Sequence, residues 1–538
     1  MILSMNRRQM LTGAAFSAAM VSVGARAAGL GPGSLFTLGV ASGEPVADGM
    51  VLWTRLAPEP LQADGGMTRG AVPVRWEIAA DEGFARPVRS GTVLAEADWA
   101  HSVHVEVSGL LPDRPYWYRF IANGEASPVG RTRTAPAPGA AVDRLRLCFG
   151  SCQKYEAGFY AAWRHVVAEE PDLILFLGDY IYEGDPNPKN AVRLHRNPQP
   201  VDLAGYRVRY ATYKMDPLLQ GAHQIAPWAT TWDDHEVVND YAGSLDEENS
   251  DPATFLKRRA AAYQAYYEHL PLRPSMRPHG PDLKLYRTLD WGALAQFQII
   301  DDRQYRGARA CQPPGLVEAH RKYKSLVAPC DDLNDPSRTM LGAEQEAWLL
   351  DRLGRSRAQW NLLAQQTLMH RQLRTDPAEP EAAPKIPADT WTGYPVARDR
   401  IFRRWAEAKT KNPLALGGDI HAFAAADLPH PDRPDGPPVA SEFVGGSISS
   451  LFHDDSYKKL ARSNGLAFAE NEVRGYARVE LTAKGADIVF RGLADALRED
   501  SAISDLAQFH VEAGRPGLTM TDNCSPEIYC NIRYTKPS

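Results

Sequence analysis

The sequence predicts an α/β protein in which a helix-flanked sheet domain follows a small all-β domain. Residues 30–135 contain short alternating, aromatic-rich runs separated by Gly, Pro and Asp, which is typical of β-strands. From residue 143 onward, apolar strand-like runs alternate with helical ones, which indicates a layered α/β domain. The Pro/Ala-rich stretch 134–141 separates the two patterns, and a length of 538 residues also favours two domains. We therefore expect domains at 30–135 and 143–515 and a C-terminal tail at 516–538.

The first residues have the pattern of an export signal sequence. Arg7 and Arg8 precede the apolar stretch 11–23, and Ala25-Arg26-Ala27 gives a small-x-small cleavage pattern. We interpret residues 1–27 as a twin-arginine signal, which predicts contact with the twin-arginine translocation machinery and a periplasmic or secreted protein. A membrane anchor is the alternative, but the stretch is short and rich in Gly, Ala and Ser, so no stable anchor is expected.

The amino-acid composition and the net charge indicate which kinds of binding partner to expect. Apolar residues make up 44% of the chain and charged residues 23%, as in ordinary globular proteins. The formal net charge is -6 and no basic block is present, so we expect no nucleic-acid-binding surface.

Two pairs of cysteines in loop-like sequence predict disulfides in an oxidising compartment: Cys311 with Cys330, and Cys524 with Cys530. Cys148 and Cys152 instead bracket the end of a strand-like segment. A disulfide between these two is an alternative, but we favour Cys148 as a buried thiol and Cys152 as exposed at the strand tip.

The N-terminal domain is predicted to be a small β-sandwich. Strands are expected at 72–78 and 101–107, and residues 110–119 resemble the Leu-x-Pro-x-x-x-Tyr stretch of fibronectin type III-like domains, whose tyrosine pins a corner. We interpret His101 and His104 as packing or solvent-facing residues rather than ligands.

Helices and strands alternate in the predicted second domain. We expect helices at 158–169, 252–269 and 342–353, and strands at 171–178, 295–300, 360–366 and 412–418. The segment after residue 495 either caps the active site or closes the fold.

Four motifs place potential ligands directly after a glycine or an apolar run. They are Gly150-Ser151-Cys152-Gln153, Gly178-Asp179-Tyr180-Ile181-Tyr182, Thr231-Trp232-Asp233-Asp234-His235-Glu236 with Asn239 beyond it, and Gly417-Gly418-Asp419-Ile420-His421. Ligands bind at the carboxyl ends of strands in α/β sheets, so four such motifs together predict an active site.

The residue types in these motifs predict a two-metal hydrolase with Asp179 as the shared ligand. A thiolate, a phenolate and an imidazole suit ferric iron, and they would come from Cys152, Tyr182 and His421. Oxygen donors suit a hard cation such as calcium or magnesium, and they would come from Asp234, Asn239 and Asp419. His235 would then contact the substrate phosphate or stabilise the leaving group.

These motifs, together with Asp302-Arg303-Gln304-Tyr305-Arg306 and Trp391-Thr392-Gly393-Tyr394, resemble the PhoD-type alkaline phosphatase and phosphodiesterase family. That family is similar to the purple acid phosphatase branch of the calcineurin-like metallophosphoesterases. The resemblance of this chain to the PhoD-type family runs from about residue 36 to residue 490. The resemblance implies a metallophosphoesterase-type β-sheet sandwich flanked by helices. It also implies an iron and calcium centre, with other divalent ions as an alternative at the second position.

The resemblance assigns ligands to each metal. It puts Cys152, Asp179, Tyr182 and His421 on iron, and Asp179, Asp419 and either Asp234 or Asn239 on calcium. Arg303 has two interpretations: it binds substrate phosphate, or it pairs with Asp301 or Asp302 to hold a loop. Trp391 and Tyr394 either rim the site or anchor a packed loop.

We expect an exported enzyme that cleaves phosphomonoesters, phosphodiesters or both by attack of a metal-bound hydroxide. Its substrate would be a small phosphate ester, with nucleotides and lipid head groups included. Phospholipase D-like action is an alternative within the same class. The alternative from another class is a non-catalytic exported module that only holds metal.

Overall fold

The computed structural model describes residues 33–316, 319–374, 383–452 and 457–521. The predicted export signal, Cys524 and Cys530 lie outside these residues. Among the helices of the described ranges, none is both long enough and apolar enough to cross a bilayer.

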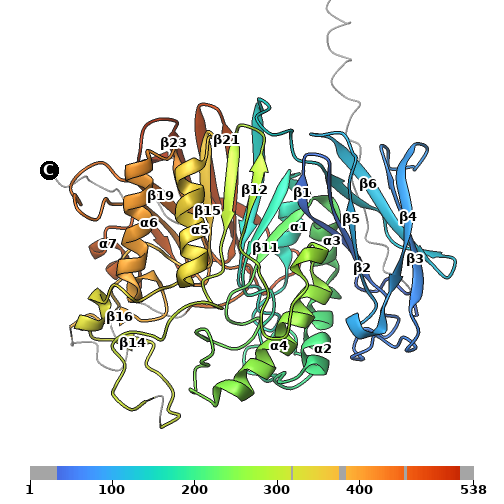
Figure 1. The fold of residues 1–538 in the computed structure, drawn as a ribbon, viewed down its shortest axis with the longest axis horizontal. Coiled ribbons are helices and arrows are strands. Elements are labelled where there is room, and N and C mark those ends of the chain that lie inside the picture. The colour runs from blue at the N-terminus through green and yellow to red at the C-terminus, as the bar shows by residue number, and fades with distance from the viewer. Residues whose placement is uncertain (1–32, 317–318, 375–382, 453–456, 522–538) are drawn as a thin grey trace, which may run out of the picture.

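Two large sheets pack face to face and form the centre of the molecule (Figure 1). The ten-stranded sheet has the order β24-β23-β22-β21-β9-β10-β11-β1-β2-β5 and the seven-stranded sheet has the order β12-β13-β15-β17-β19-β18-β20. Leu147, Leu175, Leu362, Phe443 and Phe490 belong to the buried apolar core between them. Apolar runs such as Leu173–Leu177 are therefore buried on both faces, as their composition predicts.

The strands of the ten-stranded sheet are β1 Val40–Val46, β2 Gly49–Arg55, β5 Ser102–Val107, β9 Arg144–Gly150, β10 Leu173–Leu177, β11 Trp228–Thr231, β21 Gly475–Thr482, β22 Gly485–Leu493, β23 Ile503–Glu512 and β24 Leu518–Thr521. The strands of the seven-stranded sheet are β12 Arg287–Trp291, β13 Ala295–Ile299, β15 Trp360–Ala364, β17 Pro413–Gly417, β18 Phe423–Leu428, β19 Ala440–Gly445 and β20 Phe468–Glu470. Phe509, on β23, lies in the core between the sheets, so the described part of the segment after residue 495, up to residue 521, closes the fold.

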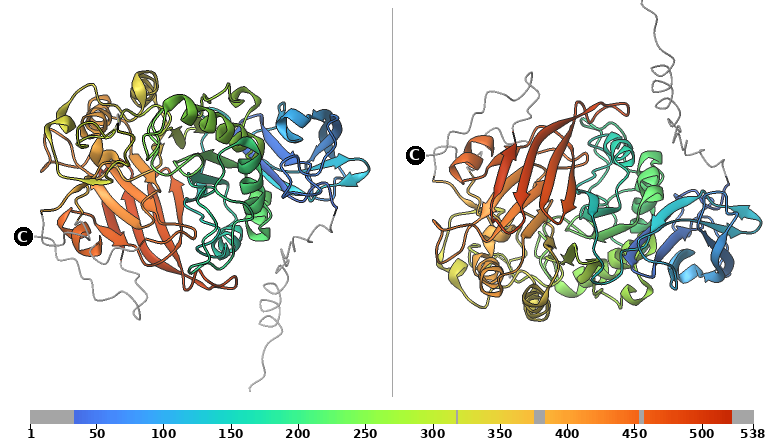
Figure 2. Two further views of the ribbon diagram at one scale, coloured as in Figure 1. Left: turned by 90° about the horizontal axis from the view of Figure 1, so that it is seen from below. Right: turned by 90° about the horizontal axis from the view of Figure 1, so that it is seen from above.

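Helices cover the outer faces of both sheets (Figure 2). The ten-stranded sheet is covered by α1 Ala161–Ala168, α2 Leu203–Lys214, α3 Pro217–Ile225 and α4 Pro252–His269. The seven-stranded sheet is covered by α5 Gly342–Arg355 and α6 Pro395–Ala408, and α7 Tyr457–Ser463 packs beside β20. Asp251 caps α4 by accepting a hydrogen bond from the Thr254 amide, with Pro252 in the first turn, so the sequence signal for this helix is confirmed.

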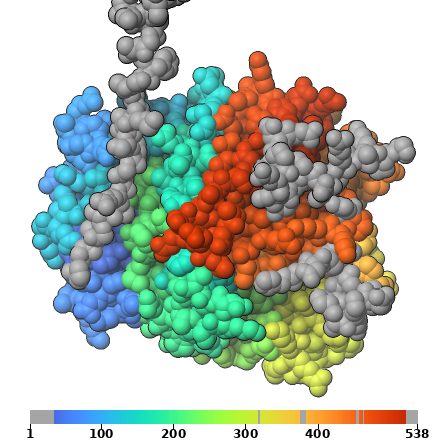
Figure 3. All heavy atoms as spheres, turned by 180° about the vertical axis from the view of Figure 1, so that it is seen from behind, coloured from blue at the N-terminus to red at the C-terminus, as the bar shows by residue number. Residues whose placement is uncertain are grey.

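The N-terminal residues form a sandwich that shares strands with the larger sheet. Its outer sheet contains β3 Val72–Ala79, β4 Pro87–Ala95, β6 Pro115–Ala122, β7 Glu125–Ala126 and β8 Gly130–Arg133. This sheet packs on β1, β2 and β5, and β1 pairs in parallel with β11. In Figure 3 the blue N-terminal residues lie at one end of the surface, and the red C-terminal residues run across its middle.

Tyr116 forms the expected tyrosine corner: its hydroxyl accepts from the Leu111 amide at 3.0 Å and donates to the Leu111 carbonyl at 3.3 Å. His101 and His104 are packing residues, with ring nitrogens bonded to the carbonyls of Gly70 and Leu272.

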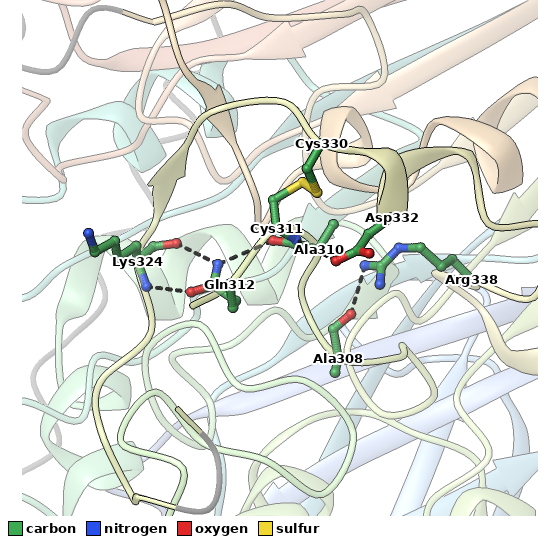
Figure 4. Close-up of a disulfide and its surroundings, with 8 residues drawn as sticks. All are labelled: Ala308, Ala310, Cys311, Gln312, Lys324, Cys330, Asp332 and Arg338. Carbon is green, nitrogen blue, oxygen red and sulfur yellow. Dashed lines mark hydrogen bonds between the residues drawn. A yellow bond between two sulfur atoms is a disulfide. The ribbon is translucent and has the colours of Figure 1, made fainter. Parts of the chain in front are cut away.

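A disulfide and a two-stranded sheet hold the long segment between β13 and α5. Cys311 and Cys330 form the predicted disulfide, and the Gln312 side chain bridges to the Lys324 backbone inside the closed loop (Figure 4). Next to it, β14 Leu326–Val327 pairs with β16 Ile386–Pro387. The short 3₁₀ helices are η1 Ala97–Trp99, η2 Pro274–Met276, η3 Asp331–Asn334 and η4 Trp391–Gly393.

Candidate metal centre

The four predicted motifs meet at one edge of the sheet sandwich. Strands β9, β10 and β11 are parallel neighbours, so their following loops lie side by side, and β17 brings the fourth loop from the facing sheet. Cys152, Asp179, Asp419 and His421 have φ values of 59°, 59°, 63° and 51°. Non-glycine residues rarely adopt this left-handed conformation, which costs about 1–3 kcal/mol and persists mainly where function requires it.

One cluster contains the predicted iron ligands. Ligand atoms of Cys152, Asp179 and His421 lie within 4.8 Å of one another. The Tyr182 hydroxyl lies 2.8 Å from Asp179 Oδ2, to which it donates, and 2.8 Å from His421 Nε2. His421 Nδ1 donates to the Leu451 carbonyl at 3.0 Å, which leaves Nε2 as the free ligand atom.

Cys152 is buried, so the prediction that it is exposed at the strand tip was wrong. The segment after β19 covers it: the hydroxyls of Ser447 and Ser450 both donate to its carbonyl. Cys148 is buried as expected, and both thiols are free, so they do not form a disulfide with each other. Nothing in the local sequence indicates that a segment almost 300 residues away closes over this strand end.

Cys152 and Tyr182 need a nearby cation to lose their protons and become metal ligands. Burial, followed by the charge of Asp179, raises the pKa of the Cys152 thiol, and the same causes raise the pKa of the Tyr182 phenol. Burial also raises the pKa of Asp179 and lowers the pKa of His421 to about 4. Asp179 Oδ1 is buried without a hydrogen-bond partner among the described residues. An orphaned carboxylate oxygen beside a thiol, a phenol and an imidazole fits a bound metal ion.

A second cluster contains oxygen donors. Ligand atoms of Asp233, Asp234 and Asp419 lie within 4.8 Å of one another, as do those of Asp179, Asp234 and His235. Asp179 and Asp234 thus connect the two clusters. Burial raises the pKa of Asp234, but Arg303 and His235 more than offset this and hold it well below its usual range. The Thr367 hydroxyl orients Asp419 by donating to its Oδ2 at 2.5 Å.

Glu183 is a site residue that the sequence interpretation missed, because it looked like a mere neighbour of Tyr182. Its Oε2 lies 2.7 Å from His235 Nδ1, and its Oε1 accepts a hydrogen bond from the Asn239 amide at 2.8 Å. Burial lowers the pKa of His235, but Glu183, Asp234 and Asp179 raise it overall. Glu183 therefore fixes both His235 and the backbone of Asn239.

Asp233 and Glu236 were also missed, although both lie within a predicted motif. Glu236 accepts hydrogen bonds from the amides of Asp179, Tyr180 and Asp233 at 3.1, 2.6 and 2.9 Å, which ties the loop after β10 to the loop after β11. Asp233 Oδ2 has no partner within the described part of the chain. An acidic residue that captures backbone amides leaves no pattern in sequence.

Arg303 lies behind the carboxylates and is fully buried. Its guanidinium bonds to Asp233 and to Asp389, the latter at 2.5 Å, and its NH2 lies 3.9 Å from both Asp234 and Asp419. The expected pairing with Asp301 is limited to the Arg303 backbone amide, and Asp302 is 3.8 Å away.

Trp391 and Tyr394 anchor a packed loop. Both are buried, Trp391 Nε1 donates to Gln365, and the Tyr394 hydroxyl donates to the Gly307 carbonyl. Of the two interpretations of these residues, loop packing fits these contacts.

Known proteins are similar to this chain in sequence and in fold. Residues 147–490 match the family model PhoD-like phosphatase, and residues 25–136 match the model PhoD-like phosphatase, N-terminal domain. The chain is 43% identical over 495 residues to alkaline phosphatase D of Bacillus subtilis (strain 168), which covers 90% of this chain and 82% of that protein. A solved structure of PhoD is 41% identical, with a TM-score of 0.85 and coverage of 92% of this chain and 94% of that one.

Proposed function

Because the chain belongs to the PhoD-like phosphatase family, we propose that its metal centre hydrolyses phosphomonoesters, phosphodiesters or both. The chain is accordingly a phosphoric ester hydrolase. The observation that carries the proposal is the meeting of Cys152, Asp179 and His421 within 4.8 Å, beside a second group of three aspartates.

The site residues fit a mixed metal pair. We assign iron to Cys152, Asp179, Tyr182 and His421, and calcium or another divalent ion to Asp179, Asp419 and either Asp234 or Asn239. Two such ions, when bound, lower the pKa of a water molecule and offset the charge on the phosphoryl oxygens.

Side chains and backbone groups around the two clusters orient the residues that would take part in hydrolysis. Asp179 belongs to both clusters, so it is suited to bridge them. The Leu451 carbonyl sets the tautomer of His421, and Glu183 sets the orientation of His235. His235 lies beside Asp179 and Asp234 and carries a raised pKa, so its imidazolium is placed to contact a phosphate oxygen or the leaving group. We assign to Arg303 the role of holding the carboxylates, because its contacts within the described residues are with acids and backbone.

Elemental analysis of the exported protein tests the metal assignment. We expect iron and calcium together in each molecule, and Asp179→Asn should lose both because this residue belongs to both clusters. Iron retained in full by Asp179→Asn would contradict the bridge. A protein that loads zinc alone would contradict the iron assignment.

Rates on three substrates test the reaction. A phosphomonoester, a bis-aryl phosphodiester and phosphatidylcholine separate monoesterase, diesterase and phospholipase D-like action, with Asp179→Asn as the inactive control. A metal-loaded protein that hydrolyses none of these would support the non-catalytic alternative instead.

We also propose that the chain leaves the cytoplasm by the twin-arginine route. The Cys311–Cys330 disulfide supports an oxidising destination. Changing Arg7 and Arg8 together to lysine should leave the protein in the cytoplasm with the disulfide reduced. Normal export of that variant would contradict the proposed route.

A further inference from the structure

A small cavity lies between the disulfide-closed segment and the loop after β11. Its volume is about 110 Å³, and Leu245, Asn249, Arg309, Gln312, Leu316 and Tyr323 contribute to its walls. Among the described residues that line it, Arg309 is the one with a permanent charge. The cavity therefore combines apolar and uncharged polar walls with a single cationic group.

Arg309 is buried but poorly satisfied. It is 7% exposed, and its Nε and NH2 have no hydrogen-bond partner within the described ranges. Its nearest carboxylate is Asp389, with Nε and Oδ1 3.5 Å apart, but Asp389 already binds Arg303 at 2.5 Å and Arg306 at 2.9 Å. Asp240 also faces Arg309, but it accepts a hydrogen bond from the Tyr323 hydroxyl, and neither carboxylate accepts one from Arg309 Nε or NH2. Buried donors without acceptors cost free energy, which an anionic ligand would recover.

Two chains of contacts between residues link the wall of the cavity to the metal centre. The Arg309 guanidinium lies 3.4 Å above the Tyr323 ring, and the Tyr323 hydroxyl bonds to Asp240. The Asp240 amide in turn donates to Asp234 Oδ2 at 2.5 Å. On the other side, Asp389 links Arg309 to Arg303. Along either chain of contacts, two residues stand between Arg309 and Asp234 of the oxygen-donor cluster.

We propose that this cavity is a substrate subsite that holds a second anionic group, carried on the alcohol part of the ester, with Arg309 as its ligand. This inference rests on the proposed function, because it assumes that a phosphate ester binds at the metal centre. A guanidinium fork matches a carboxylate, sulfate or phosphate, and Leu245 and Leu316 contribute apolar surface beside it. The preferred substrates are therefore esters with two anionic ends.

A matched series of esters tests the subsite. The probes are ω-carboxyalkyl phosphates of increasing length, each paired with the n-alkyl phosphate of the same length. For the wild type we expect kcat/KM to favour the carboxylated ester at one chain length. Arg309→Gln should reduce that preference about tenfold, mainly through KM, because a charge-assisted hydrogen bond is lost. Arg309→Lys, which keeps the charge, should restore part of it.

Arg277→Gln is the control, because Arg277 also stacks on an aromatic ring, at 3.6 Å from Trp99, but is not among the cavity's lining residues. It should keep the wild-type preference. An equal fall in kcat on both ester series in Arg309→Gln would mean that Arg309 only supports Asp389, and would overturn the subsite. A wild type that hydrolyses both series without preference at any length would overturn it too. A wild type that hydrolyses neither series would overturn the proposed function itself.

Discussion

Tyr182 is the residue that reports most directly on the identity of the metal. Its hydroxyl lies 2.8 Å from both Asp179 Oδ2 and His421 Nε2, so a bound ion would share its oxygen. An iron–tyrosinate pair absorbs visible light because a trivalent ion keeps the phenol deprotonated. We expect Tyr182→Phe to abolish a visible absorption band and to lower turnover at least about tenfold, or about 1.4 kcal/mol in activation free energy.

Absorption spectra and initial rates, recorded on the same metal-analysed samples, check this prediction. Tyr180→Phe is a suitable control, because Tyr180 is also buried but its hydroxyl bonds to His223 rather than to the site. An unchanged spectrum and rate in Tyr182→Phe would remove iron from this position.

Arg303 is the residue whose loss should most affect stability. It pairs with Asp233 and Asp389 in a fully buried position, so Arg303→Met leaves Asp233 without its ion-pair partner and removes one of the cations around Asp389. Removing one partner of a buried ion pair typically costs about 3–5 kcal/mol, and we expect a loss in that range in urea unfolding.

The alternative role of Arg303, direct binding of substrate phosphate, predicts a different result. In that case a variant would raise KM and weaken inhibition by inorganic phosphate with little loss of stability. Arg303→Lys, which keeps the charge but loses the fork, helps to separate the two roles, since it should retain more stability than Arg303→Met.

At the scale of elements, the Cys311–Cys330 bond controls the segment that carries Arg309 and Tyr323. The two cysteines are 19 residues apart in sequence. Closing a loop of this length restricts the unfolded chain, and we expect Cys311→Ser/Cys330→Ser to lower the unfolding free energy of this region by about 3 kcal/mol. Limited proteolysis and urea unfolding under oxidising conditions check the expectation. Reduced wild type should match the double variant, and equal protease resistance of the oxidised wild type and the variant would contradict it.

The loops after β9, β10, β11 and β17 show why single elements do not make the site. Each strand brings one or two ligands, and neighbouring loops hold them through side chains such as Glu236, Glu183 and Thr367. Ligand geometry therefore depends on pairs of loops rather than on one motif.

At the scale of the whole molecule, the N-terminal strands are joined to the catalytic sheet through β1 and β11. His104, on β5, packs at this junction: its ring stacks on Tyr267 of α4 at 4.2 Å, and its Nδ1 bonds to the Leu272 carbonyl. Burial lowers the pKa of His104 to about 4. Its protonation therefore opposes folding.

This junction should make the molecule sensitive to acid. A histidine with a lowered pKa contributes stability that is fully present above its unfolded pKa of about 6.5 and is lost as the pH falls through about 4. We expect His104 to account for a loss of about 1 kcal/mol between pH 7 and pH 5, after allowance for its partial exposure.

Urea unfolding of the wild type and His104→Gln at both pH values measures this contribution. The variant should be less stable at pH 7 but should lose less stability on acidification. Parallel pH dependence in the two proteins would assign the acid sensitivity to other groups. His510→Gln is a control, because the His510 side chain is 40% exposed and pairs with Asp487.

The sequence by itself indicated the α/β class, several of the strands and helices, and the residue types that meet at the candidate metal centre. Buried runs that end at a glycine, the cap of α4 and the tyrosine corner are local patterns, because each depends on neighbours a few residues apart. Cys152, Asp179, Tyr182, Asp234, Asp419 and His421 could be identified for the same reason.

Only the tertiary structure decided how those residues are covered, paired and connected. The burial of Cys152 by the segment after β19, the pairing of Arg303 with Asp233 and Asp389, the contact of Glu183 with His235 and the parallel pairing of β1 with β11 all join distant segments. Burial and ion pairing are set by whichever segments pack together, and no local pattern specifies a partner that is tens or hundreds of residues away.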